Sequence, residues 1–108
     1  MLELNNEDFN EEIKDKLVLV DFYATWCGPC RMMHPIIEEV AKEENIKVIK
    51  VDVDKHDELA RNYGIMSIPT IILFQNGNLV EKNIGFIPKE QLLTMIKNYK
   101  FFCFYGNV

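Results

Sequence analysis

The sequence predicts an α/β fold in which a mixed sheet carries helices on both faces. Two near-continuous apolar runs rich in β-favouring residues, at 17–23 and 47–53, are typical of strands that are covered on both faces. A helical pattern follows each run, at 30–44 and at 57–63. The first half of the chain therefore has the order of a βαβ unit followed by a helix.

The second half of the chain predicts an antiparallel hairpin and a closing helix. Asn76-Gly77 separates two strand-like segments, 70–75 and 79–84, and favours a tight turn because both central residues of such a turn need positive φ. A helix is expected over 88–99, because its first residue is proline and apolar residues recur after it at helical spacing. This half therefore adds a ββα unit.

The start of the chain predicts a short strand at 2–4 and a helix capped by Asn5 or Asn6. The expected inner stripe of that helix consists of Phe9, Ile13 and Leu17. Within the helix at 30–44, Pro35 predicts a kink, because proline cannot donate the backbone hydrogen bond of that turn.

The composition limits the classes of protein that fit. The chain has 108 residues, the size of one domain, and its net charge of −5 with only 12 Lys and Arg residues argues against a nucleic-acid surface. No apolar run approaches the roughly 20 residues of a membrane span, and the acidic start is unlike a targeting segment. We therefore expect a cytoplasmic protein with no nucleic-acid or membrane partner. We also expect a monomer.

The absence of a linker or an internal repeat predicts one domain, 1–99, followed by a tail, 100–108. Four of the five residues from Phe101 to Tyr105 are aromatic, so an exposed tail would be prone to aggregation. We expect the tail to fold back onto an apolar surface or to fray. Regulation through Cys103, by glutathionylation or an intermolecular disulfide, is the functional alternative.

The stretch TWCGPC places two of the three cysteines, Cys27 and Cys30, three positions apart. Together with His34 they have the spacing C-x2-C-x3-H, but structural zinc takes four ligands and no second ligand pair appears. For His34, an i,i+4 pair with Glu38 on a helix surface is the simpler interpretation. A permanent disulfide would close a loop too short to constrain the unfolded chain much. A redox couple is therefore favoured.

The position of this pair between a strand and a helix suits thiol–disulfide exchange. A cysteine attacks as a thiolate, and the amino end of a helix favours negative charge on Cys27. Cys30 lies one turn further on and faces back toward Cys27, close enough to displace a product. Gly28 and Pro29 keep the span short, and proline loses no hydrogen bond in the first turn of a helix.

Over residues 1 to about 99 the chain resembles the thioredoxin family, through the segments VDFYATWCGPC, VDVD, YGIMSIPTIILFQNG and IG. The resemblance implies a thioredoxin fold with a five-stranded mixed sheet flanked by four helices. It also implies a protein-disulfide reductase, in which Cys27 attacks a substrate disulfide and Cys30 releases the reduced product. The expected partners are protein disulfide substrates and a thioredoxin reductase. No bound cofactor or metal is expected beyond the redox-active disulfide Cys27–Cys30.

Asp21 matches the family's buried acid beneath the cysteines. A carboxylate inside LVLVDFY must lose its hydration, which favours the neutral form and raises the pKa. Asp21 is then suited to exchange a proton with Cys30 through water. Lys50 matches the family's lysine near that acid. A purely structural pair between Asp21 and Lys50 is the alternative interpretation.

The resemblance also implies a substrate-binding surface around Cys27. Ile68-Pro69 matches a proline that the family holds in cis, and the backbone before that proline pairs with the substrate chain. Trp26 is expected to be exposed, because its neighbours are polar and it adjoins the cysteines. The expected surface comprises Trp26, Gly28, Pro29, Ile68, Pro69, Gly85 and Phe86.

Three residues depart from those usual in the family, namely Tyr23, Ser67 and Phe86, and each is expected to shift partner choice. Pro29 stands where isomerase and oxidase relatives usually carry histidine, so the pair should be the poorer oxidant. Two other functions stay open: a binding or assembly subunit in which the redox step is incidental, and a thiol oxidase or isomerase.

Overall fold

The computed structural model describes the backbone of residues 1–105 and the side chains of residues 1–100. Its strands are β1 Leu2–Glu3, β2 Leu17–Tyr23, β3 Lys47–Asp52, β4 Thr70–Gln75 and β5 Asn78–Ile84. Its helices are α1 Phe9–Glu12, α2 Gly28–Glu44, α3 Asp57–Asn62 and α4 Lys89–Tyr105. Within the described residues, the strands form one sheet in the order β1-β3-β2-β4-β5.

The sheet is mixed. β3 pairs in parallel with β1 and β2, whereas β4 pairs in antiparallel with β2 and β5. The turn between β4 and β5 holds Asn76 at φ 53° and Gly77 at φ 85°, as the hairpin requires. The predicted mixed sheet of five strands with four helices is therefore confirmed.

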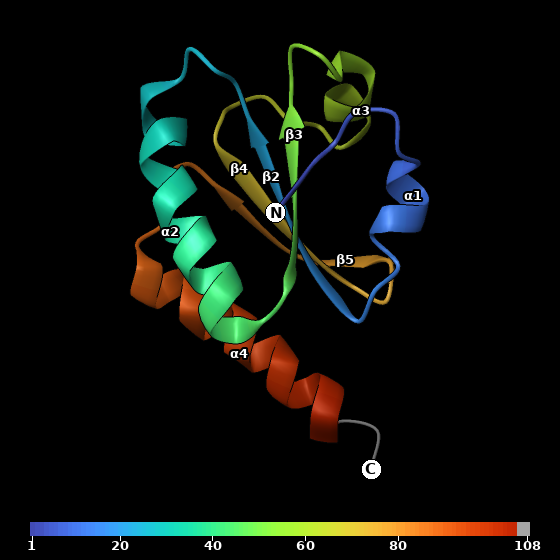
Figure 1. Ribbon diagram of the computed structural model, residues 1–108, viewed down its shortest axis with the longest axis vertical. Helices are drawn as coiled ribbons and strands as arrows, with labels where there is room; N and C mark the ends of the chain where they lie inside the picture. Colours follow the sequence, from blue (N-terminus) through green and yellow to red (C-terminus); the bar gives the residue numbers. More distant parts are fainter. Residues whose placement is uncertain (106–108) are drawn as a thin grey trace.

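Helices cover both faces of the sheet (Figure 1), with α2 and α4 packed on one face and α1 and α3 on the other. Side chains alternate along β2, so Leu19 faces α2 and α4, whereas Val20 and Phe22 face the opposite layer. Asp21 has the same parity as Leu19. The carboxylate therefore lies on the side of the sheet that α2 covers.

The first helix begins later and is shorter than predicted. Asp8 caps α1, because its carboxylate accepts a 3.0 Å hydrogen bond from Asn10 N, so the expected cap at Asn5 or Asn6 was wrong. Leu17 belongs to β2 and pairs in register with Gln75, rather than extending a helical stripe. Strand pairing has outweighed the helical periodicity at this position.

The last helix continues past Tyr99 to Tyr105, beyond its expected end. The sequence from Tyr99 to Tyr105 contains no glycine or proline, the residues that most often stop a helix. The side chains of the expected tail beyond Lys100, including Cys103, lie outside the described residues. No helix in the described part of the chain is long and apolar enough to cross a membrane.

Candidate active site

The cysteine pair lies where β2 ends and α2 begins. A disulfide joins Cys27 and Cys30, whose Cα atoms are 5.2 Å apart. Cys27 is the N-cap of α2, and its Sγ accepts a 3.2 Å hydrogen bond from the Cys30 backbone N–H. Pro29 lies in the first turn, where its missing N–H costs no helical hydrogen bond. The amino end of α2 is thus directed at the Cys27 sulfur.

Both cysteines are buried in this oxidised pair. Cys27 is 6% exposed and Cys30 is 3% exposed, so Cys30 is buried as a resolving partner should be, but Cys27 is not the exposed nucleophile that the sequence led us to expect. The reason is packing, because the two sulfurs lie together against Ala24 and the partly buried Ile68. A substrate disulfide therefore has only a small part of Cys27 to contact.

The loop that contains Ile68 and Pro69, here called the proline loop, faces Cys27. The Ile68–Pro69 peptide bond is cis, and the Ile68 carbonyl oxygen lies 3.8 Å from the Cys27 sulfur. The backbone N–H of Gly85 donates a 2.8 Å hydrogen bond to the Pro69 carbonyl and so ties the loop to the end of β5. Gly85 has φ +91°, and a Cβ there would meet nothing within 4 Å. Glycine is therefore favoured at this position by the backbone conformation and not by close packing.

Asp21 is fully buried on β2 and lies beside Lys50 in the register of β2 and β3. The Lys50 Nζ atom is 3.9 Å from Asp21 Oδ2, and neither carboxylate oxygen has a hydrogen-bond partner among the described residues. Burial raises the pKa of Asp21 to about 6; the positive charge of Lys50 opposes this rise, and the negative charge of Glu3 adds to it. Asp21 is therefore able to exchange a proton near neutral pH.

Lys50 also contacts two groups that the sequence did not connect with it. Its Nζ atom lies 2.6 Å from His34 Nδ1 and 4.3 Å from the centre of the Tyr23 ring. The expected proximity of His34 and Glu38 is present at 4.0 Å. Alternation along β3 places Lys50 on the α2 side of the sheet, and this is the signal that could have predicted a partner on that helix.

A cavity of about 260 Å³ opens beside this group, and Cys30, His34 and Lys50 are among its lining residues. The sequence-predicted residues Asp21, Lys50 and Cys30 thus belong to one region of the molecule, on the α2 side of the sheet. Among the side chains that the structure describes, no group of three or more His, Cys, Asp and Glu residues is arranged to hold a metal ion.

The expected substrate surface is only partly exposed. Trp26 is 66% exposed, as predicted, and its Nε1–H donates a 2.9 Å hydrogen bond to Asp54 Oδ2. Phe86 and Pro29 are also exposed, whereas Pro69 is buried. Gly28, Ile68 and Gly85 are intermediate.

Sequence reasoning missed the most exposed large apolar side chain in the described part of the chain, Met66, which is 96% exposed. Met32 and Ile84 are also exposed, and neither was expected to be part of the surface. Met66 precedes Ile68 by two residues in the segment GIMSIP. Its position in the proline loop could therefore have predicted that it lies on the expected substrate surface.

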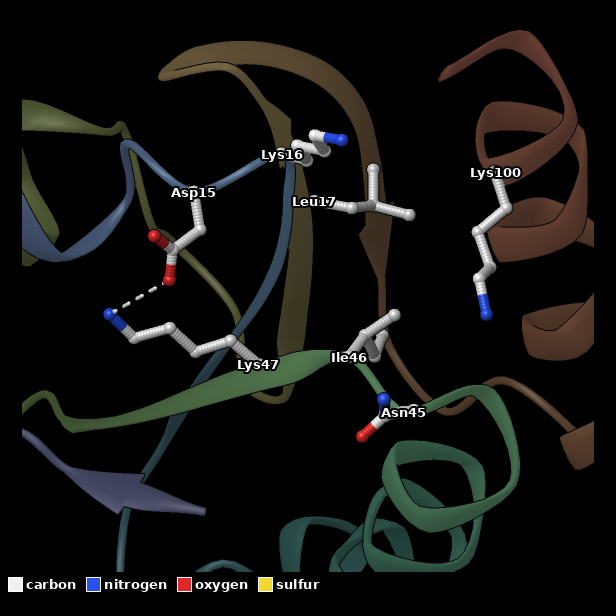
Figure 2. Close-up of a pocket in the computed structure, with 7 residues that line it drawn as sticks. All are labelled: Asp15, Lys16, Leu17, Asn45, Ile46, Lys47 and Lys100. Carbon is white, nitrogen blue, oxygen red and sulfur yellow. Dashed lines mark ion pairs between the residues drawn. The ribbon is translucent and has the colours of Figure 1, made fainter. Parts of the chain in front are cut away.

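A second hollow lies at the other end of β2 from the cysteines (Figure 2). It is lined by Asp15, Lys16, Leu17, Asn45, Ile46, Lys47 and Lys100. Figure 2 shows no cysteine or histidine among these residues, and the ion pair between Asp15 and Lys47 occupies one side. None of its lining residues is shared with the cavity beside Cys30.

Residues 1–98 match the family model described as thioredoxin. The chain belongs to the thioredoxin family. It is 46% identical to the thioredoxin of Listeria monocytogenes over 99 residues, which cover 90% of this chain and 96% of the relative. It is 40% identical to the thioredoxin of Bacillus subtilis over 101 residues, covering 92% and 97%.

Solved thioredoxin structures have the same fold. A mutant thioredoxin from Halobacterium salinarum superposes with a TM-score of 0.86 at 37% identity, covering 91% of this chain and 88% of that chain. Mitochondrial thioredoxin 3 from Saccharomyces cerevisiae, in its oxidised form, superposes with a TM-score of 0.81 at 34% identity, covering 91% and 94%. This member of the thioredoxin family is therefore a protein-disulfide oxidoreductase with a redox-active Cys27–Cys30 pair.

Proposed function

We propose that this thioredoxin-family protein reduces protein disulfides, with Cys27 as the nucleophile and Cys30 as the resolving thiol. The observation that carries the assignment is the position of Cys27 as the N-cap of α2, with a backbone N–H directed at its sulfur. In the reduced protein the same N–H and the helix dipole favour a thiolate on Cys27. Cys30 lies inside the helix and lacks this position.

The proposed reaction has two exchange steps. The Cys27 thiolate attacks one sulfur of the substrate disulfide, the substrate S–S bond breaks, and the departing thiolate takes a proton from solvent. Cys30 then loses its proton and attacks the Cys27 sulfur, which breaks the mixed disulfide and releases the second substrate sulfur as a thiolate. The substrate gains two electrons, and the Cys27–Cys30 pair is oxidised.

Asp21 is proposed as the acceptor of the Cys30 proton, through water in the region beneath the disulfide. Its burial, its lack of hydrogen-bond partners and its pKa of about 6 support this role. Lys50 is proposed to act through Asp21, because its charge stabilises the carboxylate form that must be present before the Cys30 proton is accepted.

The substrate chain is proposed to lie across the exposed Trp26 and Phe86 and to pair with the backbone at Ile68, before the cis proline. Gly28, Pro29, Pro69 and Gly85 would shape this surface around Cys27. The 3.8 Å separation of the Ile68 carbonyl from the Cys27 sulfur supports a contact of substrate backbone close to the reacting atoms.

We further propose a cytoplasmic monomer that a thioredoxin reductase returns to the dithiol form. The activity is assigned to the domain of residues 1–99, in agreement with the family match over 1–98. Another similar structure, with a TM-score of 0.82 at 33% identity, comes from work on the thiol resolving mechanism in yeast mitochondrial 1-Cys peroxiredoxin via glutathione/thioredoxin systems. This likeness supports disulfide-bonded protein substrates.

The test is reduction of insulin disulfides with dithiothreitol as electron donor. Cys27→Ser should abolish the acceleration over dithiothreitol alone, because no nucleophile remains. Cys30→Ser should instead accumulate a mixed disulfide with the substrate on Cys27, visible on a non-reducing gel, because the resolving thiol is missing. If the unmodified protein reduced insulin no faster than Cys27→Ser and dithiothreitol alone, only a binding or assembly role would remain. A strongly oxidising reduction potential would favour an oxidase or isomerase.

A further inference from the structure

Lys50 lies between a buried acid and a histidine. On one side its Nζ atom is 3.9 Å from Asp21 Oδ2, which is beyond hydrogen-bonding distance. On the other side the same atom is 2.6 Å from His34 Nδ1, which is a close hydrogen bond. The ring of Tyr23 lies against a third side, with its centre 4.3 Å from Nζ. The ammonium group is therefore bonded toward α2 rather than toward the carboxylate.

The chemistry of the two groups fixes the direction of this hydrogen bond. A lysine ammonium has donors and no acceptor, so Lys50 donates and His34 Nδ1 accepts. The imidazole must then carry its proton on Nε2, the atom that lies 4.0 Å from Glu38 Oε2. His34 Nδ1 is thus the acceptor of this hydrogen bond, and the other ring nitrogen points toward an acidic residue of the same helix.

The lack of hydrogen bonds at Asp21 is the second part of the observation. Both of its oxygens are buried and without a hydrogen bond among the described residues, although a lysine with three donors lies next to them. Buried polar side-chain atoms normally have at least one hydrogen-bond partner. The bond to His34 Nδ1 uses only one of the three donors, but it holds Nζ 3.9 Å from Asp21 Oδ2, beyond hydrogen-bonding distance.

We propose that His34 is a positioning residue, which accepts a hydrogen bond from Lys50, holds the ammonium out of hydrogen-bonding contact with Asp21, and thereby keeps the Asp21 carboxylate free to take the Cys30 proton. The inference rests on the proposed role of Asp21. It concerns a histidine that the sequence presented only as a surface residue or a metal-ligand candidate. Three elements, β2, β3 and α2, supply the three side chains.

The other charged groups around Lys50 are engaged elsewhere. Glu3 of β1 accepts a 2.7 Å hydrogen bond from the Tyr23 hydroxyl. Asp52 of β3 accepts one from the Asp54 backbone N–H. On α2, the Arg31 guanidinium donates to the Thr25 carbonyl.

The side chain of Glu38 lies near His34 and is half exposed. None of these charged groups is paired with Asp21 in the described part of the chain, so His34 is the group whose removal should redirect Lys50.

The experiment is a carboxyl ¹³C NMR titration of Asp21 in the full-length oxidised protein, in which Cys27 and Cys30 are joined in a disulfide and do not titrate. His34→Ala should lower the Asp21 pKa by about one unit, because Lys50 can then move into hydrogen-bonding contact with the carboxylate and favour its charged form. His34→Asn should leave it near the unmodified value, because an amide oxygen can accept the Lys50 hydrogen bond. Glu38→Gln is the matched surface control and should leave the value unchanged.

A second measurement follows turnover against pH. The acid limb of the profile should move to lower pH in His34→Ala by the same amount as the NMR value, and should stay in place in His34→Asn. An unchanged Asp21 pKa in His34→Ala would overturn the proposal, as would an equal fall in His34→Asn. Failure of the proposed function is separate, because full activity of Asp21→Asn would reject the proton-acceptor role, and with it the turnover prediction, without altering the NMR titration of either His34 variant.

Discussion

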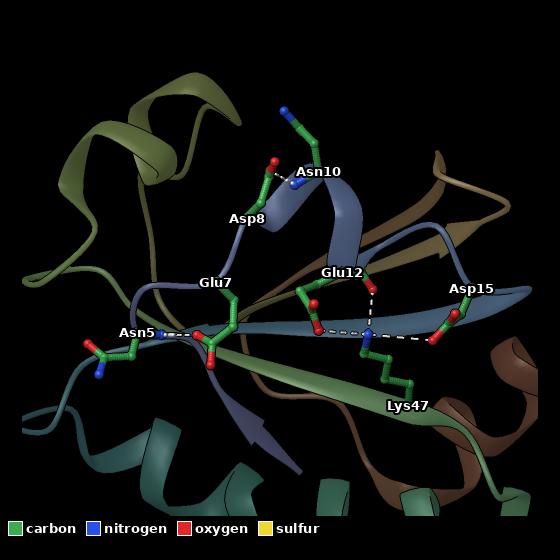
Figure 3. A network of polar contacts seen from close by, with 7 residues as sticks. All are labelled: Asn5, Glu7, Asp8, Asn10, Glu12, Asp15 and Lys47. Carbon is green, nitrogen blue, oxygen red and sulfur yellow. Dashed lines mark hydrogen bonds and ion pairs between the residues drawn. The ribbon is translucent and has the colours of Figure 1, made fainter.

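Two lysines of β3, Lys47 and Lys50, each lie beside an aspartate. Lys47 donates hydrogen bonds to an acidic residue, whereas Lys50 donates none to its neighbouring aspartate. Lys47 donates to the Glu12 carbonyl at 2.8 Å and to Glu12 Oε1 at 2.9 Å, and it pairs with Asp15 at 3.5 Å (Figure 3). Lys50 stands 3.9 Å from Asp21, whose oxygens have no hydrogen bond among the described residues. The Lys47 side chain is 29% exposed and that of Lys50 is 11% exposed.

The pKa values follow this difference. Burial opposes the charge of Lys47, but the hydrogen bond to Glu12 and the attraction of Asp15 and Glu12 outweigh it, so the pKa of Lys47 is raised. At the other site burial dominates and raises the pKa of Asp21 to about 6. The hydrogen bonds and ion pairs around Lys47 stabilise its charged form. Asp21 has no hydrogen bond among the described residues, so its protonation state can change near pH 6. This is the physical distinction between the Lys47 end of β3 and the end at which we propose proton transfer.

The pH dependence of stability should show the largest contrast. Between the ordinary value of 3.8 and about 6, the native state binds the Asp21 proton more tightly than the unfolded state, so this group lowers the unfolding free energy as pH rises. The loss should reach about 3 kcal/mol by pH 7. Asp21→Asn should remove it, and guanidinium unfolding of both oxidised proteins across that range measures the difference. A pH-independent difference between them would contradict the raised pKa.

Turnover should separate the two aspartates next. Asp21→Asn is expected to slow insulin reduction about tenfold at neutral pH, since general-base assistance to the resolving thiol is lost. Asp15→Asn is the matched control at the other end of the sheet and should reduce insulin at the unmodified rate. Equal rates in all three proteins would mean that Asp21 and Lys50 form a purely structural pair with no role in turnover.

The smallest effect is expected at Lys47. Lys47→Met should lower the unfolding free energy by about 1 kcal/mol, because the Glu12 carbonyl and carboxylate lose their hydrogen-bond donor. The effect is small because the ion pair is partly exposed and screened by salt. Its insulin reduction should stay unchanged. Thermal unfolding at low and high salt provides the measurement, and a smaller difference at high salt is expected. A stability loss accompanied by slower turnover would mean that the two ends of β3 are coupled.

Much of the fold could be predicted because its signals are local. The apolar run that becomes β2 and the Asn76-Gly77 turn each specify a conformation within a few residues. The first helix could not be placed well, because Asn5, Asn6 and Asp8 are all good caps and only packing of the following residues selects Asp8.

The sequence by itself determined the cysteine pair, its place between a strand and a helix, and the desolvation of Asp21, because each follows from neighbours along the chain. Only the tertiary structure decided that both cysteines are buried and that Lys50 bonds to His34 rather than to Asp21. The reason is that these facts depend on the register of β2 against β3 and on which residue of α2 faces the sheet at that point. Contacts between segments far apart in sequence leave no local pattern to read.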